Sequence, residues 1–221
     1  MQEMILILDF GSQYTQLIAR RVRELNIYCE IHPYNNIPKI TDNIKGVILS
    51  GSPFSVRDND SPEPDLSSIK GEIPLLGVCY GAQYLVQSND GEVSPSKIRE
   101  YGRANLSHIE SNSKLLENIK HGSQVWMSHG DNINQIPKLF SITSLSNNKI
   151  ISSIENSKNK IYCLQFHPEV YHTDFGSKII HNFIFNIVKV KYKFKIHKFI
   201  ENKVLELKKI IKDKKIICGL S

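Results

Sequence analysis

Residues 73–81 read Ile73-Pro74-Leu75-Leu76-Gly77-Val78-Cys79-Tyr80-Gly81. The apolar first half is typical of a strand buried on both faces, and the residues that follow favour a helix. A cysteine between two glycines at such a junction predicts a nucleophile elbow, a sharp turn that lifts the side chain above the sheet. The N-terminus of the following helix would favour the thiolate. The alternative is a structural cysteine in an ordinary turn.

Similar buried runs occur on both sides of this junction. Residues 4–8, 27–31, 46–49 and 161–166 are apolar without alternation, and helical spacing separates several of them. This pattern predicts an α/β fold with a mainly parallel open sheet flanked by helices. Alternating pieces and Asn or Ser turns between residues 92 and 157 predict a small antiparallel extension.

The C-terminal part has a different organisation. Residues 175–190 and 196–211 carry apolar residues at helical spacing, and residues 216–218 are typical of a strand. We therefore expect one domain over residues 1–190, followed by a linker, a helix and a strand over residues 191–221.

Composition and charge exclude several classes of protein. No apolar run approaches the roughly 20 residues of a membrane helix, and no secretion signal is visible, so we expect a soluble cytoplasmic protein without membrane contacts. Cys29, Cys79, Cys163 and Cys218 lack the spacing of a zinc site or a disulfide framework, so we expect no metal. Residues 189–215 hold eleven lysines against three acidic residues, a balance of +8 that leaves the other residues at −2. A basic tail of this kind does not predict nucleic-acid binding.

A second chemical signal is Gln165-Phe166-His167-Pro168-Glu169, at the end of a predicted strand. A nucleophile needs a base that a third group orients, and an imidazole and a carboxylate lie here two positions apart. Both side chains could face the same side of the strand end. Taken alone, the same residues would suit an exposed polar turn.

Two short loops complete the set of signals. Leu49-Ser50-Gly51-Ser52-Pro53 follows a predicted strand and could direct backbone N–H groups into a cleft. Together with the amide of Tyr80, such a loop could stabilise an oxyanion. The second loop, residues 127–131, is polar and compact. Taken alone, each loop is typical of an ordinary turn.

In order and spacing, these four places resemble the class I, triad-type glutamine amidotransferases over residues 4–190. The resemblance implies a flavodoxin-like fold. It also implies that Cys79 is the nucleophile, that His167 is the base and that Glu169 orients His167. It implies oxyanion donors from the backbones of Ser52 and Tyr80, and it implies no cofactor for this domain. The glutamine-binding residues that it implies are Gly51, Gln83, Ser128, His129, Gly130 and Asp131.

The sequence departs from the family pattern at Ser52, where a second glycine is usual. If that position required a positive φ, the serine would cost on the order of 1 kcal/mol. The backbone donor would still be present.

Within the family, the chain is most similar to the GMP synthetases, in residues 7–24, 99–102, 128–131 and 166–173. This resemblance implies a full enzyme, a homodimer, that uses ATP and Mg²⁺ to aminate xanthosine monophosphate with the released ammonia. Residues 215–221 resemble the first strand of its ATP pyrophosphatase domain, so we expect that domain as the partner beyond Ser221.

Three alternatives stay open at this point. One is a glutaminase subunit that serves anthranilate, carbamoyl phosphate or cytidine nucleotide synthesis. Another is a regulatory module without catalytic activity, against which an intact set of Cys79, His167 and Glu169 argues. The third is a Cys-His hydrolase on a similar sheet, which would lack the glutamine-binding loops.

Overall fold

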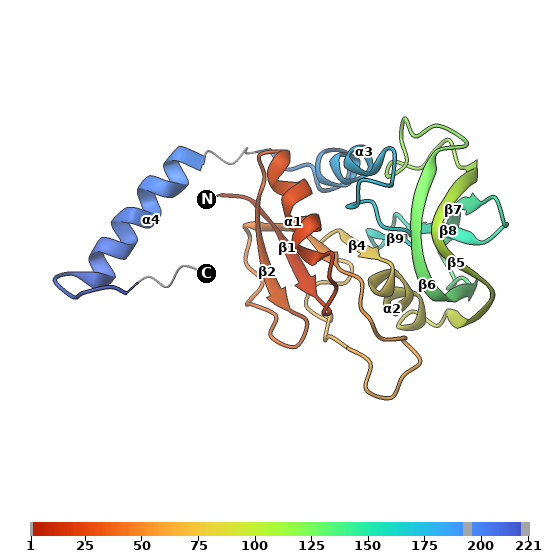
Figure 1. Cartoon of the computed structure of the whole chain (residues 1–221), viewed down its shortest axis with the longest axis horizontal. Coiled ribbons are helices and arrows are strands. Elements are labelled where there is room, and N and C mark those ends of the chain that lie inside the picture. The colour runs from red at the N-terminus through yellow and green to blue at the C-terminus, as the bar shows by residue number, and fades with distance from the viewer. Residues whose placement is uncertain (1, 192–195, 218–221) are drawn as a thin grey trace.

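The computed structural model describes residues 2–191 and 196–217 (Figure 1). In this part of the chain, nine strands form one sheet with helices on both faces. In chain order the elements are β1 (Met4–Asp9), α1 (Thr15–Glu24), β2 (Tyr28–Pro33), β3 (Ile44–Leu49), β4 (Leu75–Val78), α2 (Tyr80–Gln87), β5 (Glu92–Ile109), β6 (Gln124–Gln135), β7 (Ser141–Ser146), β8 (Ile151–Asn156), β9 (Ile161–Leu164), α3 (Gly176–His181), the π-helix η1 (Asn182–Val188) and α4 (Ile196–Ile211).

The sheet has a parallel half and an antiparallel half. Its strand order is β2-β1-β3-β4-β9-β8-β7-β5-β6. The first five strands of that order are parallel, and every pair from β9 to β6 is antiparallel. The predicted fold class is confirmed, including the antiparallel extension. The carboxyl ends of β1, β3, β4 and β9 therefore meet at one edge, where binding sites of open α/β sheets form.

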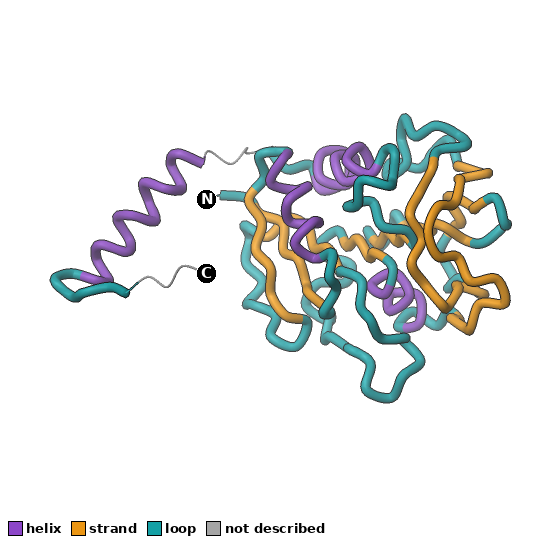
Figure 2. The backbone as a smooth tube through the Cα atoms, in the orientation of Figure 1, coloured by secondary structure: helices purple, strands orange, loops and turns teal. Residues whose placement is uncertain are grey.

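Alternate residues of the central strands fill two hydrophobic cores. Ile5 and Ile7 of β1 pack in the core under α1, α3 and η1, whereas Leu6 and Leu8 pack in the core under α2. Figure 2 shows these helices on the two faces of the sheet. All four side chains are fully buried. Burial on both faces explains why these strands show no polar alternation in the sequence.

The segment predicted as one helix over residues 175–190 has two parts. The α-helix α3 passes into the π-helix η1 at Asn182, and η1 ends before Lys189, which has a φ of 60°. The Asn182 side-chain amide donates hydrogen bonds to the carbonyls of Leu115 and Glu117 at 3.0 and 2.8 Å. Apolar spacing predicted the helical segment but not the change from α-helix to π-helix within it.

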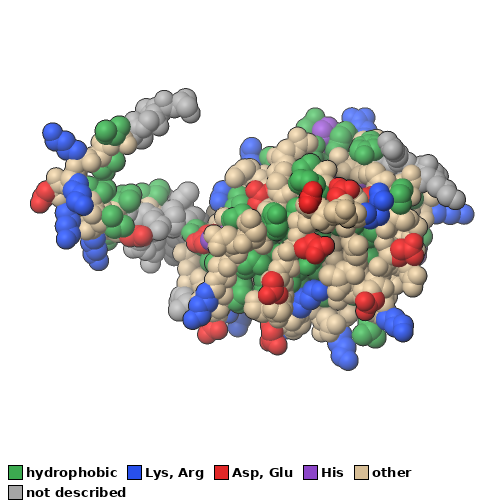
Figure 3. Space-filling model, turned by 90° about the horizontal axis from the view of Figure 1, so that it is seen from below, with side chains coloured by type: hydrophobic (Ala, Val, Ile, Leu, Met, Phe, Trp, Pro, Cys, Tyr) green, Lys and Arg blue, Asp and Glu red, His purple; other side chains and the backbone are tan. Residues whose placement is uncertain are grey.

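The predicted amphipathic helix near the C-terminus is present as α4, which lies apart from the sheet (Figure 1). Its apolar side chains Ile200, Val204 and Leu207 are 53%, 43% and 51% exposed. Figure 3 shows hydrophobic and basic side chains together on the part of the molecule that lies apart from the sheet. The strand predicted at residues 216–218 is wrong for its described residues. Ile216 and Ile217 are in no strand, pair with none of the strands that the structure describes, and are 67% and 96% exposed. Cys218 lies outside the described residues.

Candidate active site

Cys79 occupies the tight turn between β4 and α2. Its φ of 52° and ψ of −106° are unusual for a residue with a side chain, and such strain is typical of functional positions. The flanking glycines are required by close packing: a Cβ on Gly77 would lie 2.6 Å from the carbonyl oxygen of Gly81, and one on Gly81 would lie 2.6 Å from Cβ of Leu49. The predicted sharp turn is therefore present, and glycine is the residue that fits at positions 77 and 81 without a shift of the surrounding atoms.

His167 and Glu169 form a buried hydrogen-bonded pair. His167 Nδ1 lies 2.7 Å from Glu169 Oε1, and the two side chains are 4% and 0% exposed. Neighbouring groups fix the backbone of this turn, since Thr173 Oγ1 donates to the carbonyl of His167 at 2.6 Å and Arg21 Nε donates to that of Glu169 at 3.0 Å. With Nδ1 engaged, the Nε2 side of the imidazole is left for the cavity described below.

Electrostatics favour a charged imidazole at this position. Burial of His167 acts to lower its pKa, but the negative charges of Glu169 and of the Cys79 thiolate outweigh it and raise that pKa well above its usual value. An imidazolium stabilises a neighbouring thiolate. Burial raises the pKa of the Cys29 and Cys163 thiols, so neither is suited to nucleophilic chemistry.

The loop after β3 lies against both reactive side chains. A Cβ on Gly51 would lie 3.3 Å from Cε1 of His167 and 3.7 Å from Cβ of Cys79. Ser50 holds this loop in place, because its hydroxyl accepts a hydrogen bond from the amide of Phe10 at 3.0 Å. Ser52 is not among the residues with positive φ, so the strain considered for a serine here does not arise.

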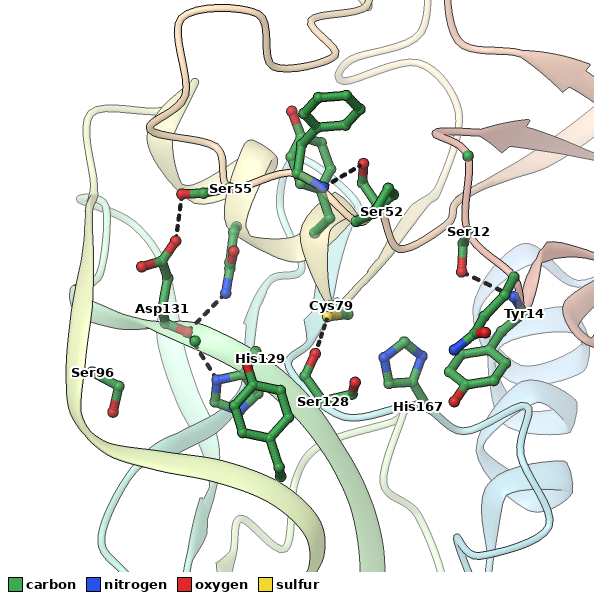
Figure 4. Close-up of a pocket in the computed structure, with 18 of the residues that line it drawn as sticks. Ser12, Tyr14, Ser52, Ser55, Cys79, Ser96, Ser128, His129, Asp131 and His167 are labelled. Atoms are coloured by element: carbon green, nitrogen blue, oxygen red, sulfur yellow. Dashed lines mark hydrogen bonds between the residues drawn. The ribbon is translucent and has the colours of Figure 1, made fainter.

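A cavity of about 670 Å³ opens beside Cys79 (Figure 4). Cys79 and His167 line it from neighbouring strand ends, and β6 forms much of the opposite wall. The predicted site residues that line it are Ser52, Cys79, Tyr80, Gln83, Ser128, His129, Gly130, Asp131 and His167. The two that do not line it are Gly51, which lies against the reactive pair, and Glu169, which lies behind His167.

Hydrogen bonds fix the wall that carries residues 128–131. Gln83 Nε2 donates to the carbonyl of Asp131 at 2.9 Å and to Oε1 of Gln165 at 3.2 Å. His129 Nδ1 lies 2.9 Å from the same Asp131 carbonyl, and the Cys79 thiol lies 3.7 Å from the carbonyl of Ser128. The glutamine-binding residues that the resemblance implies thus come together around one cavity, although they belong to separate elements.

Sequence reasoning missed two residues that contact Asp131. The Ser55 hydroxyl donates to Oδ2 at 2.5 Å, and Arg57 donates to Oδ1 from Nη2 at 2.8 Å and from Nε at 3.2 Å. Ser55 and Arg57 lie two and four positions after the loop of residues 49–53. A hydroxyl and a guanidinium so close to that loop were the available signal. Tyr14 was also missed as a cavity residue, and its ring meets the edge of His167 at a centroid distance of 5.0 Å.

Two general features of the described residues concern metal ions and membrane-crossing helices. Among residues 2–191 and 196–217, no three His, Cys, Asp or Glu side chains gather in a way that could hold a metal ion. In the same residues, no helix has the length and apolar character that crossing a membrane requires.

Comparisons with known proteins agree on one family. The family model described as glutamine amidotransferase class-I matches residues 6–187. Proteins named GMP synthase (glutamine-hydrolyzing) from Christiangramia forsetii and Phocaeicola vulgatus are 51% and 50% identical to the chain over 221 residues. Each match covers 100% of this chain but 43% of the relative, so the chain spans less than half the length of these relatives.

Solved structures extend the same likeness. A structure from Thermoplasma acidophilum, described as that of a GMP synthase subunit, has a TM-score of 0.75 and 28% identity, covering 91% of this chain and 98% of that chain. A glutamine amidotransferase from Thermotoga maritima shares the fold with a TM-score of 0.62 at 19% identity, covering 95% of this chain and 86% of that chain. The match of the family model, which runs from within β1 to within η1, shows that the chain belongs to the class I glutamine amidotransferase family.

Proposed function

We propose that this chain hydrolyses L-glutamine to L-glutamate and ammonia, with Cys79 as the nucleophile. The observation that carries the proposal is the arrangement at one cavity of a cysteine on a strained turn and a histidine hydrogen-bonded to a buried carboxylate at 2.7 Å. A nucleophile, its base and the group that orients the base are the parts that acyl transfer requires.

In the proposed reaction, the Cys79 thiolate attacks the γ-carboxamide carbon. The tetrahedral intermediate collapses as the C–N bond breaks, His167 gives its proton to the leaving nitrogen, and ammonia departs from a γ-glutamyl thioester. A water molecule then attacks the thioester while His167 takes its proton, and glutamate leaves as the thiolate re-forms. Glu169 keeps the imidazole oriented and balances its charge throughout both steps.

Backbone amides are the proposed oxyanion donors. The N–H of Tyr80 lies in the first turn of α2, where helical N–H groups have no carbonyl in a preceding turn. The neighbouring amide of Gly81 is occupied by the carbonyl of Ser50 at 3.1 Å. The amide of Ser52, on the loop next to the reactive pair, is proposed as the second donor.

For the whole protein we propose GMP synthesis, in line with the names of the relatives. Residues 1–190 would be the glutaminase domain, and residues 191–221 would lead into an ATP pyrophosphatase domain. That domain would use ATP and Mg²⁺ to activate xanthosine monophosphate, which the released ammonia then aminates. A homodimeric full enzyme and a cytoplasmic location are further parts of this proposal.

The first experiment uses the chain of residues 1–221. Glutamate and ammonia released from L-glutamine are measured for the wild type, for Cys79→Ala and for Cys29→Ala, which removes a thiol that does not line the cavity. We expect equal amounts of both products from the wild type and from Cys29→Ala, and none from Cys79→Ala. Product release that persists in a folded Cys79→Ala variant would refute the proposed nucleophile.

A second experiment tests the wider proposal with the full-length protein. GMP formation from xanthosine monophosphate and ATP is measured with either L-glutamine or ammonium chloride as the nitrogen source. Cys79→Ala should abolish GMP formation from glutamine and leave the ammonium-dependent reaction intact. Equal loss of both reactions would mean that Cys79 does more than release ammonia.

A further inference from the structure

We infer that Arg57 recognises the α-carboxylate of glutamine, and that it exchanges partners with Asp131 when the amino acid binds. This inference rests on the proposed function, since it assigns a further residue to the same substrate. Arg57 lies outside the motifs that indicated the family, on the long connection between β3 and β4.

Apart from the reactive pair of Cys79 and His167, the described side chains that line the cavity include one cation and one anion. Among the described residues that line it, Arg57 is the one lysine or arginine and Asp131 is the one carboxylate. The α-carbon of free glutamine carries one carboxylate and one ammonium group at neutral pH. The cavity therefore offers one complementary charge to each of these two groups.

In this structure the two protein charges satisfy each other. Arg57 donates two hydrogen bonds to Oδ1 of Asp131, and the Ser55 hydroxyl donates to Oδ2. A carboxylate that is 9% exposed needs such compensation, because a buried unpaired charge is costly. A substrate ammonium group could replace the guanidinium at Oδ1 without leaving the carboxylate unpaired.

The two partners differ in how firmly they are held. Asp131 lies in β6, and its carbonyl accepts the hydrogen bond from Gln83, so its position is fixed by the sheet and by α2. Arg57 lies on a connection rather than in a helix or strand, and its side chain is 41% exposed. The guanidinium is thus the member of the pair that can move. Once released from Asp131, its planar fork can bind a carboxylate through two parallel hydrogen bonds.

This arrangement predicts selectivity for the free amino acid. A glutamine whose α-carboxylate is esterified would still offer its ammonium group to Asp131, but it would offer no anion to Arg57. The released guanidinium would then lose its hydrogen bonds to Asp131 without gaining an equivalent partner. Free L-glutamine should therefore bind more tightly than its methyl ester, and Arg57 should account for the difference.

The test measures protection of Cys79 from alkylation in the chain of residues 1–221. Iodoacetamide is a suitable reagent because it carries no amino-acid head group, and mass spectrometry follows its addition to the Cys79 peptide. L-Glutamine or L-glutamine methyl ester is titrated as the competitor. The variants are Arg57→Gln, the charge-conserving Arg57→Lys, and Arg20→Gln, which removes an exposed arginine of α1 that does not line the cavity. Thermal unfolding checks that each variant is folded.

We expect Arg57→Gln to raise the half-protecting concentration of L-glutamine roughly 10-fold or more, the scale of lost hydrogen bonds to a charged group. The same variant should leave the value for the methyl ester unchanged or lower it, because Asp131 is no longer shared with a guanidinium. Arg57→Lys should give an intermediate result, and Arg20→Gln should behave as the wild type does.

Two different results would overturn the inference. If Arg57→Gln leaves the ratio between glutamine and the ester at its wild-type value, Arg57 does not recognise the carboxylate, although the proposed function stands. If glutamine gives no protection in the wild type at any concentration, the glutamine site itself is refuted, and the proposed function fails together with the inference.

Discussion

Nδ1 of His167 lies 2.7 Å from Oε1 of Glu169, and the carboxylate has no exposed surface. The negative charge of this carboxylate raises the pKa of His167, against the opposing effect of burial. This contact holds the imidazole in one orientation at the wall of the cavity, which Cys79 also lines. Several consequences of the pair can be measured.

The first prediction concerns the pH dependence of stability. The folded-state pKa of His167 is raised, so the stability contributed by its charge is fully present below the unfolded pKa and declines as pH rises through the folded pKa. In a Cys79→Ala background, which leaves Glu169 as the partner, we compare His167→Gln with its parent by urea unfolding between about pH 6 and about pH 9. The advantage of the parent should shrink as pH rises. A constant or growing advantage would contradict the charged pair.

The second prediction concerns the order of catalytic losses. Cys79→Ala should abolish glutamine hydrolysis, and His167→Ala should lower kcat by roughly 10³-fold or more, because the thiol then loses its base and the leaving group its proton. Glu169→Ala should cost less, since the imidazole remains. Steady-state ammonia release gives these values. If Glu169→Ala were the most damaging change, the roles assigned to the three residues would be wrong.

The third prediction concerns the strained turn. Cys79→Ala retains a Cβ at a φ of 52°, whereas Cys79→Gly removes it, and both variants lack the thiol. Glycine relieves the backbone strain of the folded state, but it also raises the conformational entropy of the unfolded state. The first effect on the free energy of unfolding should be the larger, so Cys79→Gly should be more stable than Cys79→Ala by about 1 kcal/mol. Denaturant unfolding of the two variants measures the difference. A less stable glycine variant would show that the turn carries no strain at this residue.

The fourth prediction concerns Ser52. Its proposed role depends on the backbone amide, and its hydroxyl accepts a local hydrogen bond from the amide of Phe54 at 3.2 Å. Ser52→Gly should therefore keep kcat within roughly 3-fold of the wild type, as expected for a surface turn with an intact donor. A much larger loss of kcat would show that the hydroxyl itself contacts the substrate.

Local sequence predicted the parts of the site that depend on neighbouring residues. The turn at Cys79 follows from a buried strand, two glycines and a helix, and the pair of His167 and Glu169 follows from a spacing of two residues at a strand end. Their positions in the structure agree with these predictions, while their catalytic roles stay predictions.

The contacts that sequence did not reveal join distant segments. Arg57 meets Asp131 across 74 positions of the chain, and no local periodicity reports such a contact. Asn182, where the α-helix passes into the π-helix, donates its side-chain hydrogen bonds to carbonyls of residues 115 and 117, which lie far from it in the sequence. The expected strand at residues 216–218 failed in its described part for a related reason, because a strand needs a partner strand as well as apolar residues.

The central claim is that glutamine hydrolysis passes through a thioester on Cys79. The most direct measurement is the mass of the Cys79 peptide after the chain is mixed with L-glutamine and quenched with acid, which preserves thioesters. We predict a fraction of that peptide heavier by one glutamyl group, an adduct that hydroxylamine removes as γ-glutamyl hydroxamate, that increases when Glu169→Gln slows the second step, and that is absent from Cys79→Ala. Hydrolysis of glutamine without any such adduct, or an adduct on Cys29 or Cys163 instead, would contradict the account.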